Sequence, residues 1–148
     1  MVREEKIEKL IAVAKSLIGV PYKYGAQMKE APEFFDCSGF VKYIFLQVGI
    51  ELPRSTIEQA VEGEEVTKDN LEFGDLIFLR GERGHYNASF PEGIGHVMLY
   101  IGNGKIIHAK SERIQEKPIV EKGEVKEEPL EGPISRGGPI IVIKRIVG

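Results

Sequence analysis

The spacing of hydrophobic residues changes once along this 148-residue chain, close to Gly74. Before Gly74, apolar residues recur at the three- and four-residue intervals of amphipathic helices, which predicts helices over 3–18, 36–49 and 55–62. After Gly74, short apolar runs bounded by glycine and polar residues predict strands over 76–79, 97–101, 105–109 and 140–146. Helices in the first half followed by strands in the second half indicate an α+β domain.

The chain length fits a single domain covering 1–148 and is sufficient to bury a hydrophobic core without disulfide or metal support. The net charge of -3 at pH 7 gives no sign of the basic excess that nucleic-acid-binding proteins carry. No apolar run approaches the length of a membrane span. The charged start, residues 1–6, lacks the apolar region and cleavage site of a secretory signal. We therefore expect a soluble protein that is cytoplasmic as far as this chain indicates.

Three segments lack regular periodicity and are predicted to be irregular. Residues 22–35 contain Gly25 and Pro32 as breakers, and residues 80–95 are polar. Residues 111–139 carry many charges and several prolines. We expect this last stretch to be a long surface connection in which any β pairing is irregular.

Cys37 is the only cysteine, which excludes an internal disulfide and a zinc site built from several cysteines. It falls where the second predicted helix begins. Unpaired backbone N–H groups and the positive end of the helix dipole lower the pKa of a thiol at such a position, and the thiolate is the nucleophile. A lone cysteine is as often a small buried core residue. Position alone leaves both interpretations open.

A reactive thiol needs a base, and the chain has three histidines, His85, His96 and His108. His85 lies in the polar loop 80–95, where a plain surface histidine is equally expected. His96 and His108 lie on two consecutive predicted strands joined at Gly102-Asn103-Gly104. Whether these two histidines can meet depends on the register of that hairpin.

Two registers are possible for the hairpin. A two-residue turn pairs residues whose numbers sum to 207, which places His96 and His108 on opposite faces. A three-residue loop with a type I turn and a left-handed Gly104 gives sums of 206, which makes the histidines diagonal neighbours on one face. Glycine at the third position favours the second register, in which one imidazole orients the other. A zinc site of Cys37, His96 and His108 is the chemical alternative, although it lacks a fourth protein ligand.

Four motifs now stand in order along the chain. They are Asp36-Cys37-Ser38-Gly39-Phe40-Val41, Leu52-Pro53-Arg54-Ser55, Gly74-Asp75-Leu76-Ile77-Phe78 and the stretch from His96 to Ala109. Together they resemble the NlpC (p-sixty type) family of papain-like cysteine peptidases over residues 7–109, and loosely to the last strand. The resemblance implies a papain-like α+β fold, with the nucleophile at the N-terminus of a helix packed on an antiparallel β-sheet.

The resemblance also implies an activity. Cys37 would be the nucleophile, His96 the base and His108 the residue that orients His96, with no metal or cofactor required. Family members are mostly bacterial cell-wall enzymes that cut the D-γ-glutamyl–diamino acid bond of peptidoglycan stem peptides. We therefore expect a peptide or peptidoglycan fragment as the partner, and no nucleic acid.

Three further residues match family positions near the substrate. Tyr22 would shape the oxyanion pocket, and Asp36 and Ser38 would contact the free amine of the substrate. N-capping of the helix explains Asp36 equally well, and its carboxylate by itself would raise the pKa of the neighbouring thiol. Ser55 could touch the substrate, but it also begins a capping box with Glu58.

Two segments depart from the family pattern, since 27–35 and 80–95 look longer than usual. Both are expected to border the cleft, so the substrate stays open. The alternatives are a cysteine amidase or acyltransferase of the same fold acting on another γ-glutamyl or acyl substrate, and a non-catalytic binding module. The sequence does not fix the oligomeric state.

Overall fold

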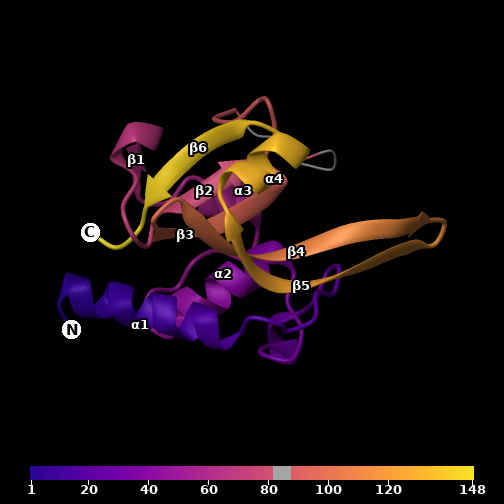
Figure 1. The fold of residues 1–148 in the computed structure, drawn as a ribbon, viewed down its shortest axis with the longest axis horizontal. Helices are drawn as coiled ribbons and strands as arrows, with labels where there is room; N and C mark the ends of the chain where they lie inside the picture. The colour runs from indigo at the N-terminus through magenta and orange to yellow at the C-terminus, as the bar shows by residue number, and fades with distance from the viewer. Residues whose placement is uncertain (82–87) are drawn as a thin grey trace.

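The computed structural model describes residues 1–81 and 88–148, without the side chains at 112, 113, 119 and 121 (Figure 1). Its helices are α1 (Arg3–Ser16), α2 (Cys37–Leu46), α3 (Thr56–Gln59) and α4 (Glu131–Arg136), with single 3-10 turns at Met28–Glu30 and Lys68–Asn70. Its strands are β1 (Glu64–Val66), β2 (Leu76–Leu79), β3 (His96–Gly102), β4 (Lys105–Glu116), β5 (Ile119–Pro129) and β6 (Ile140–Arg145). They form one sheet in the order β1-β6-β2-β3-β4-β5, with every neighbouring pair antiparallel. The predicted α+β class is confirmed.

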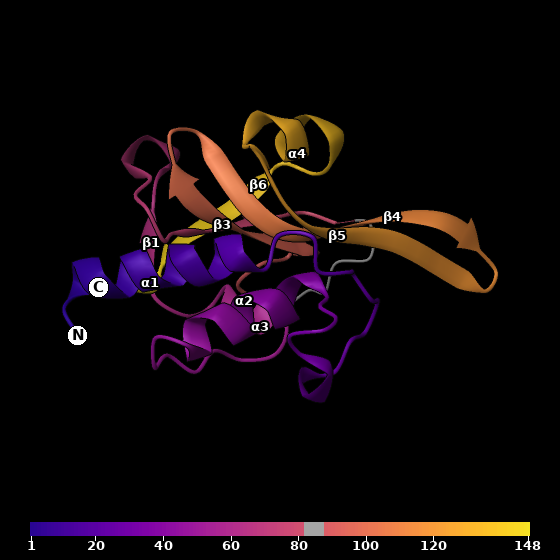
Figure 2. The same ribbon diagram turned by 60° about the horizontal axis from the view of Figure 1, so that its bottom comes forward.

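The sheet buries both faces because its central strands alternate between two apolar clusters. One face packs against α1 and α2 through residues such as Phe78, Leu99 and Ile107. The opposite face carries Met98, Ile106 and their neighbours and packs against Leu130 and the α4 segment. Figure 2 shows α1 and α2 on one side of the sheet and α4 on the other.

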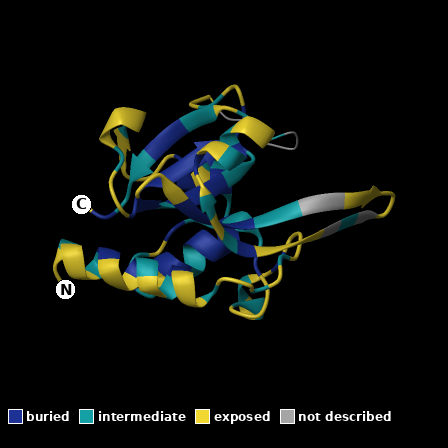
Figure 3. Cartoon of the chain, viewed as in Figure 1, coloured by how far each residue is buried: buried dark blue, intermediate teal, exposed yellow. Residues whose placement is uncertain are grey.

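Helix α2 lies at the centre of the larger cluster. Its residues Phe40, Val41, Ile44 and Phe45 are fully buried, and each such side chain contributes roughly 1.5–3 kcal/mol on leaving water. Figure 3 shows α2 and the middle of the sheet as buried, whereas the outer face of α1 is exposed. The helix that begins at Cys37 is therefore held firmly in place by its own packing.

The β3–β4 hairpin has the predicted register but not the predicted turn. Tyr100 pairs with Ile106, and Leu99 with Ile107, so the paired numbers sum to 206. Asn103 (φ 54°) and Gly104 (φ 72°) are both left-handed, as in a two-residue type I′ turn. A register shift between Tyr100 and Gly102, where φ is 89°, adds the residue that the three-residue loop was expected to supply. The face-sharing of the two strand histidines follows from this bulge.

The prediction that 111–139 is an irregular connection is wrong. Strands β4 and β5 pair from Lys105↔Pro129 to Glu116↔Ile119, with one register shift between Arg113 and Gln115, and α4 follows. The far end of this hairpin projects from the body of the domain (Figure 1). Its inner end is anchored, because Gly19 N–H donates to the Val125 carbonyl at 2.8 Å. A ribbon with solvent on both faces needs no apolar alternation, so its sequence lacks the usual strand signal.

Within the described part of the chain, none of the helices has both the length and the apolar character needed to cross a bilayer.

Candidate active site

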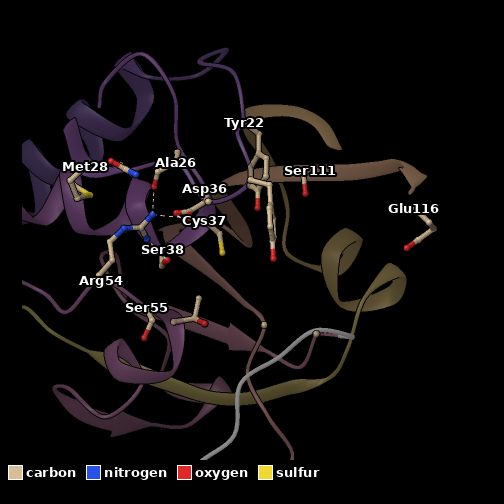
Figure 4. Close-up of a pocket in the computed structure, with 16 residues that line it drawn as sticks. Tyr22, Ala26, Met28, Asp36, Cys37, Ser38, Arg54, Ser55, Ser111 and Glu116 are labelled. Atoms are coloured by element: carbon tan, nitrogen blue, oxygen red, sulfur yellow. Dashed lines mark hydrogen bonds and ion pairs between the residues drawn. The ribbon is translucent and has the colours of Figure 1, made fainter. Parts of the chain in front are cut away.

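Cys37 is the first residue of α2 and is a free, half-buried cysteine. It lies on a pocket of about 900 Å³. The pocket walls come from the segment 22–28, the start of α2, residues 54–56, Gly81, Gly95 and two residues of β4, Ser111 and Glu116. Figure 4 shows the Cys37 sulfur pointing into this hollow, with Tyr22 beside it.

The thiol of Cys37 is not acidified as its position at a helix N-terminus predicts. Burial, and then the Asp36 carboxylate, raise its pKa to about 12. Backbone hydrogen bonds from Val97 and Ser38 and the charge of Arg54 lower it, but by less. Desolvation by burial outweighs the effect of the helix N-terminus, so the isolated thiol is neutral at pH 7.

His96 and His108 are brought together by the hairpin. The Nε2 atom of His96 lies 2.7 Å from Nδ1 of His108, and the rings cross at 65°. Both residues occupy the sheet face of Met98, because strand residues two apart share a face. This hydrogen bond engages Nε2 of His96, which leaves Nδ1 as the ring nitrogen available to a substrate or thiol.

Burial keeps both imidazoles neutral. Desolvation, with a smaller contribution from His108, lowers the pKa of His96 to about 3. Desolvation also lowers the pKa of His108 to about 4, although a hydrogen bond to Glu128 opposes it. The resting site at pH 7 therefore holds two neutral imidazoles.

Glu128 is a site residue that the sequence analysis missed. Its Oε2 lies 2.7 Å from Nε2 of His108, and Nη2 of Arg136 donates to its Oε1 at 2.7 Å. Lys110 Nζ lies 3.9 Å from the same Oε2 atom. Glu128 lies on β5 directly opposite Ile106 of β4. Ile106 precedes His108 by two residues, so Glu128 and His108 lie on the same face of the sheet. Only the recognition of β5 as a strand would have revealed it.

Arg54 links the two residues that flank Cys37. Its Nη2 donates to Oδ2 of Asp36, and its Nη1 donates to Oγ of Ser38, both at 2.8 Å. Arg54 also donates to the Ala26 carbonyl. The predicted N-cap is confirmed, because Oδ1 of Asp36 accepts from the Gly39 N–H at 2.7 Å.

Tyr22 and Ser55 lie in the pocket wall. The backbone of Tyr22 bridges to Phe35 and donates to the Gly123 carbonyl at 2.8 Å, which ties the pocket to β5. Ser55 caps α3, accepting from the Glu58 N–H at 3.3 Å. The predicted N-cap is confirmed, but the reciprocal half of the capping box is not formed, because the Glu58 carboxylate accepts from the Ser55 hydroxyl at 2.7 Å and not from its backbone N–H. Helix α3 is also shorter than the predicted 55–62.

No group of three or more His, Cys, Asp and Glu side chains suited to a metal ion occurs in residues 1–81 and 88–148 where side chains are described. The zinc alternative has a further difficulty, because both ring nitrogens of His108 already have partners. His85 lies outside the described residues.

A cysteine that begins the central helix, packed on an antiparallel sheet that carries a histidine pair, places the chain among the papain-like α+β proteins. Residues 19–128 match the sequence profile of the NlpC/P60 family. This match covers well over half of the chain, so the chain belongs to the NlpC/P60 family.

Named relatives and solved structures agree with this family. The chain is 37% identical over 102 residues to the gamma-DL-glutamyl hydrolase of Bacillus subtilis, covering 69% of this chain and 23% of that protein. It is 42% identical over 95 residues to the murein DD-endopeptidase MepS/murein LD-carboxypeptidase of Escherichia coli, covering 63% and 44%. An NlpC/P60 family protein from Bacillus cereus superposes with a TM-score of 0.74 at 29% identity, covering 96% of this chain and 40% of that one. The chain thus spans less than half the length of these relatives.

Proposed function

We propose that this domain is a cysteine peptidase that hydrolyses an amide bond of peptidoglycan stem peptides through Cys37, His96 and His108. The observation that carries the proposal is the 2.7 Å contact between Nε2 of His96 and Nδ1 of His108. It fixes the ring of His96 and leaves Nδ1 to act on the thiol, which lies at the start of β3, because the backbone of Val97, next to His96, hydrogen-bonds to Cys37. Nucleophile, base and orienting group are the three parts that acyl transfer needs.

The reaction starts from a neutral pair. Burial disfavours a lone thiolate and a lone imidazolium, so the proton passes directly from the Cys37 sulfur to Nδ1 of His96 as the sulfur attacks the carbonyl. The Cys37 backbone N–H and the Tyr22 hydroxyl stabilise the oxyanion. Imidazolium N–H of His96 then protonates the leaving amine. Water hydrolyses the thioester, with His96 taking its proton, and restores the thiol.

The preferred bond is the amide between D-γ-glutamate and the diamino acid of the stem peptide. Asp36 presents a carboxylate in the pocket wall that accepts the free amine at the start of such a peptide, with Ser38 beside it. The gamma-DL-glutamyl hydrolase among the relatives supports a γ-glutamyl bond. The endopeptidase and carboxypeptidase named for the other relative support cell-wall peptides but other bonds. The bond is therefore the part of the proposal that most needs a test.

The test compares wild type with Cys37→Ala on a panel of defined substrates, read by mass spectrometry. The panel contains a stem tetrapeptide with a free amino terminus, a DD-crosslinked dimer of that tetrapeptide, a γ-DL-glutamyl oligomer and an acylated γ-glutamyl amide. We expect cleavage after D-γ-glutamate by wild type and none by Cys37→Ala. Cleavage of only the oligomer or the amide would move the assignment to an amidase or acyltransferase. A wild type that cuts nothing on the panel would refute the peptidase proposal.

A further inference from the structure

The carboxylate of Glu128 stands behind the histidine pair, with a side chain that is 11% exposed. It bonds to the far nitrogen of His108, and His108 bonds through its near nitrogen to His96. We propose that Glu128 is a positioning residue, which sets the tautomer of His96 by setting that of His108. The inference rests on the proposed function in one respect, since it takes His96 as the base.

The direction of every proton in this chain follows from the carboxylate. An ionised carboxylate only accepts hydrogen bonds, so Nε2 of His108 must carry a hydrogen. A neutral His108 then has a lone pair at Nδ1, and Nε2 of His96 must be the donor to it. A neutral His96 protonated at Nε2 has its lone pair at Nδ1. That tautomer is the one able to take a proton from Cys37.

Glu128 is held in its ionised, acceptor-only form. Burial opposes ionisation, but hydrogen bonds from Arg136 and His108 outweigh it and lower the pKa of Glu128 to about 2. Among the side chains that the structure describes, the charged and titratable ones in contact with Glu128 are His108 and Lys110 from β4 and Arg136 from α4. Among the groups that lower the pKa of Glu128, the Arg136 hydrogen bond from α4 contributes most. Gly132 of α4 leaves room for the Arg136 guanidinium, because a Cβ at this position would lie 3.1 Å from its Nη1.

A purely structural role for Glu128 makes different predictions. Loss of a buried ion pair would lower stability but would leave the tautomers and the reactivity of Cys37 unchanged. A positioning role requires the thiol to respond to a substitution two hydrogen bonds away. Since the chain has one cysteine, alkylation by iodoacetamide reports on Cys37 alone and needs no substrate.

The first experiment measures the rate of Cys37 alkylation from pH 5 to 10 in wild type, Glu128→Ala and Glu128→Gln. Glu127→Gln is the matched control, because Glu127 is the neighbour on β5 that pairs instead with Lys105 at 3.8 Å. We expect the rate at pH 7 to fall about 10- to 100-fold in Glu128→Ala, the loss of one charge-assisted hydrogen bond. We expect less than about a twofold change in Glu127→Gln, since exposed pairs contribute little. Equal rates in Glu128→Ala and wild type would overturn the proposal.

The second experiment assigns the ring tautomers by nitrogen-15 NMR at pH 7, and it is decisive even where Glu128→Ala does not fold. We expect His96 and His108 of wild type both to be protonated at Nε2, and a mixture in the folded Glu128 variants. Protonation of His108 at Nδ1 in wild type would refute the inference. Absence of stem-peptide cleavage combined with Glu128-dependent tautomers would reject the proposed substrate and leave the positioning role intact.

Discussion

Asp36 has three roles in the structure and the proposal, and one substitution separates them. It caps α2 through Gly39, pairs with Arg54, and is proposed to accept the amine of the substrate. Asp36→Asn keeps the cap, because asparagine is as good an N-cap as aspartate, whereas Asp36→Ala loses it. The pair Asp36→Asn and Asp36→Ala therefore separates the charge from the cap.

The stability expected for each variant follows from these contacts. Asp36→Asn removes an ion pair whose side chains are 16% and 35% exposed, which costs about 1 kcal/mol or less of unfolding free energy. Asp36→Ala also leaves the Gly39 N–H without its 2.7 Å acceptor, which costs roughly 1 kcal/mol more. Urea unfolding of both variants measures the difference. An Asp36→Asn variant as unstable as Asp36→Ala would contradict the capping argument.

The thiol and the substrate respond in opposite directions. The Asp36 carboxylate raises the pKa of Cys37, so Asp36→Asn should lower that pKa and speed alkylation near pH 8. Cleavage of a stem peptide with a free amine should nevertheless slow by about 10- to 100-fold in kcat/KM, the loss of a charge-assisted hydrogen bond. A peptide whose amine is acetylated should show no such loss. An equal loss with both peptides would refute amine recognition by Asp36.

Three other perturbations give clear outcomes. Because folding lowers the pKa of His96 to about 3 and of His108 to about 4, the unfolded chain binds more protons below pH 6.5. As the pH is lowered below 6.5, the unfolding free energy should therefore decrease, by up to about 1.4 kcal/mol per pH unit for each histidine. Urea unfolding at a series of pH values measures this dependence, and His108→Leu should make it less steep. Arg145→Met leaves the fully buried Asp75 carboxylate without the cation that donates two 2.9 Å hydrogen bonds to it. Thermal unfolding should show a loss of about 3–5 kcal/mol in unfolding free energy, and a loss under about 1 kcal/mol would contradict this expectation. Gly39→Ala places a Cβ 2.8 Å from Oδ1 of Asp36, so it should displace this carboxylate and lower kcat/KM for a stem peptide with a free amine. Gly49→Ala, whose Cβ would lie in open space, should affect stability alone.

Burial decided which elements could be predicted from the sequence. Helix α2 and strands β2, β3 and β6 each have a face that must leave water, and that requirement produces the spacing from which they were predicted. The arm of β4 and β5 has no such face at its far end, so its charges and prolines indicated a loop. Glu128 was lost with it, because a site residue can be assigned only after its strand is known.

The β3–β4 hairpin shows how a correct register can follow from a wrong turn. The glycine pattern predicts one unpaired residue inside a three-residue loop, whereas the chain places that residue in a bulge beside a two-residue turn. Both arrangements offset the strands equally, and the hydrophobic faces of Leu99 and Ile107 require that offset. Register is thus set by which side chains must be buried, whereas the turn type depends on local backbone energies that the pattern does not reveal.

The prediction that the helix N-terminus lowers the pKa of Cys37 was wrong for a related reason. The helix N-terminus is visible in the chain, but the burial that outweighs it is produced by the folded structure and leaves no local pattern in the sequence. In the proposed mechanism this burial is useful. Glu128 raises the pKa of His96 while Lys110 lowers it, so Glu128 favours the imidazolium that exists only once the thiol has given up its proton. A carboxylate that stabilises the charged form of the base, behind a resting site that is neutral, lowers the barrier more than it stabilises the ground state.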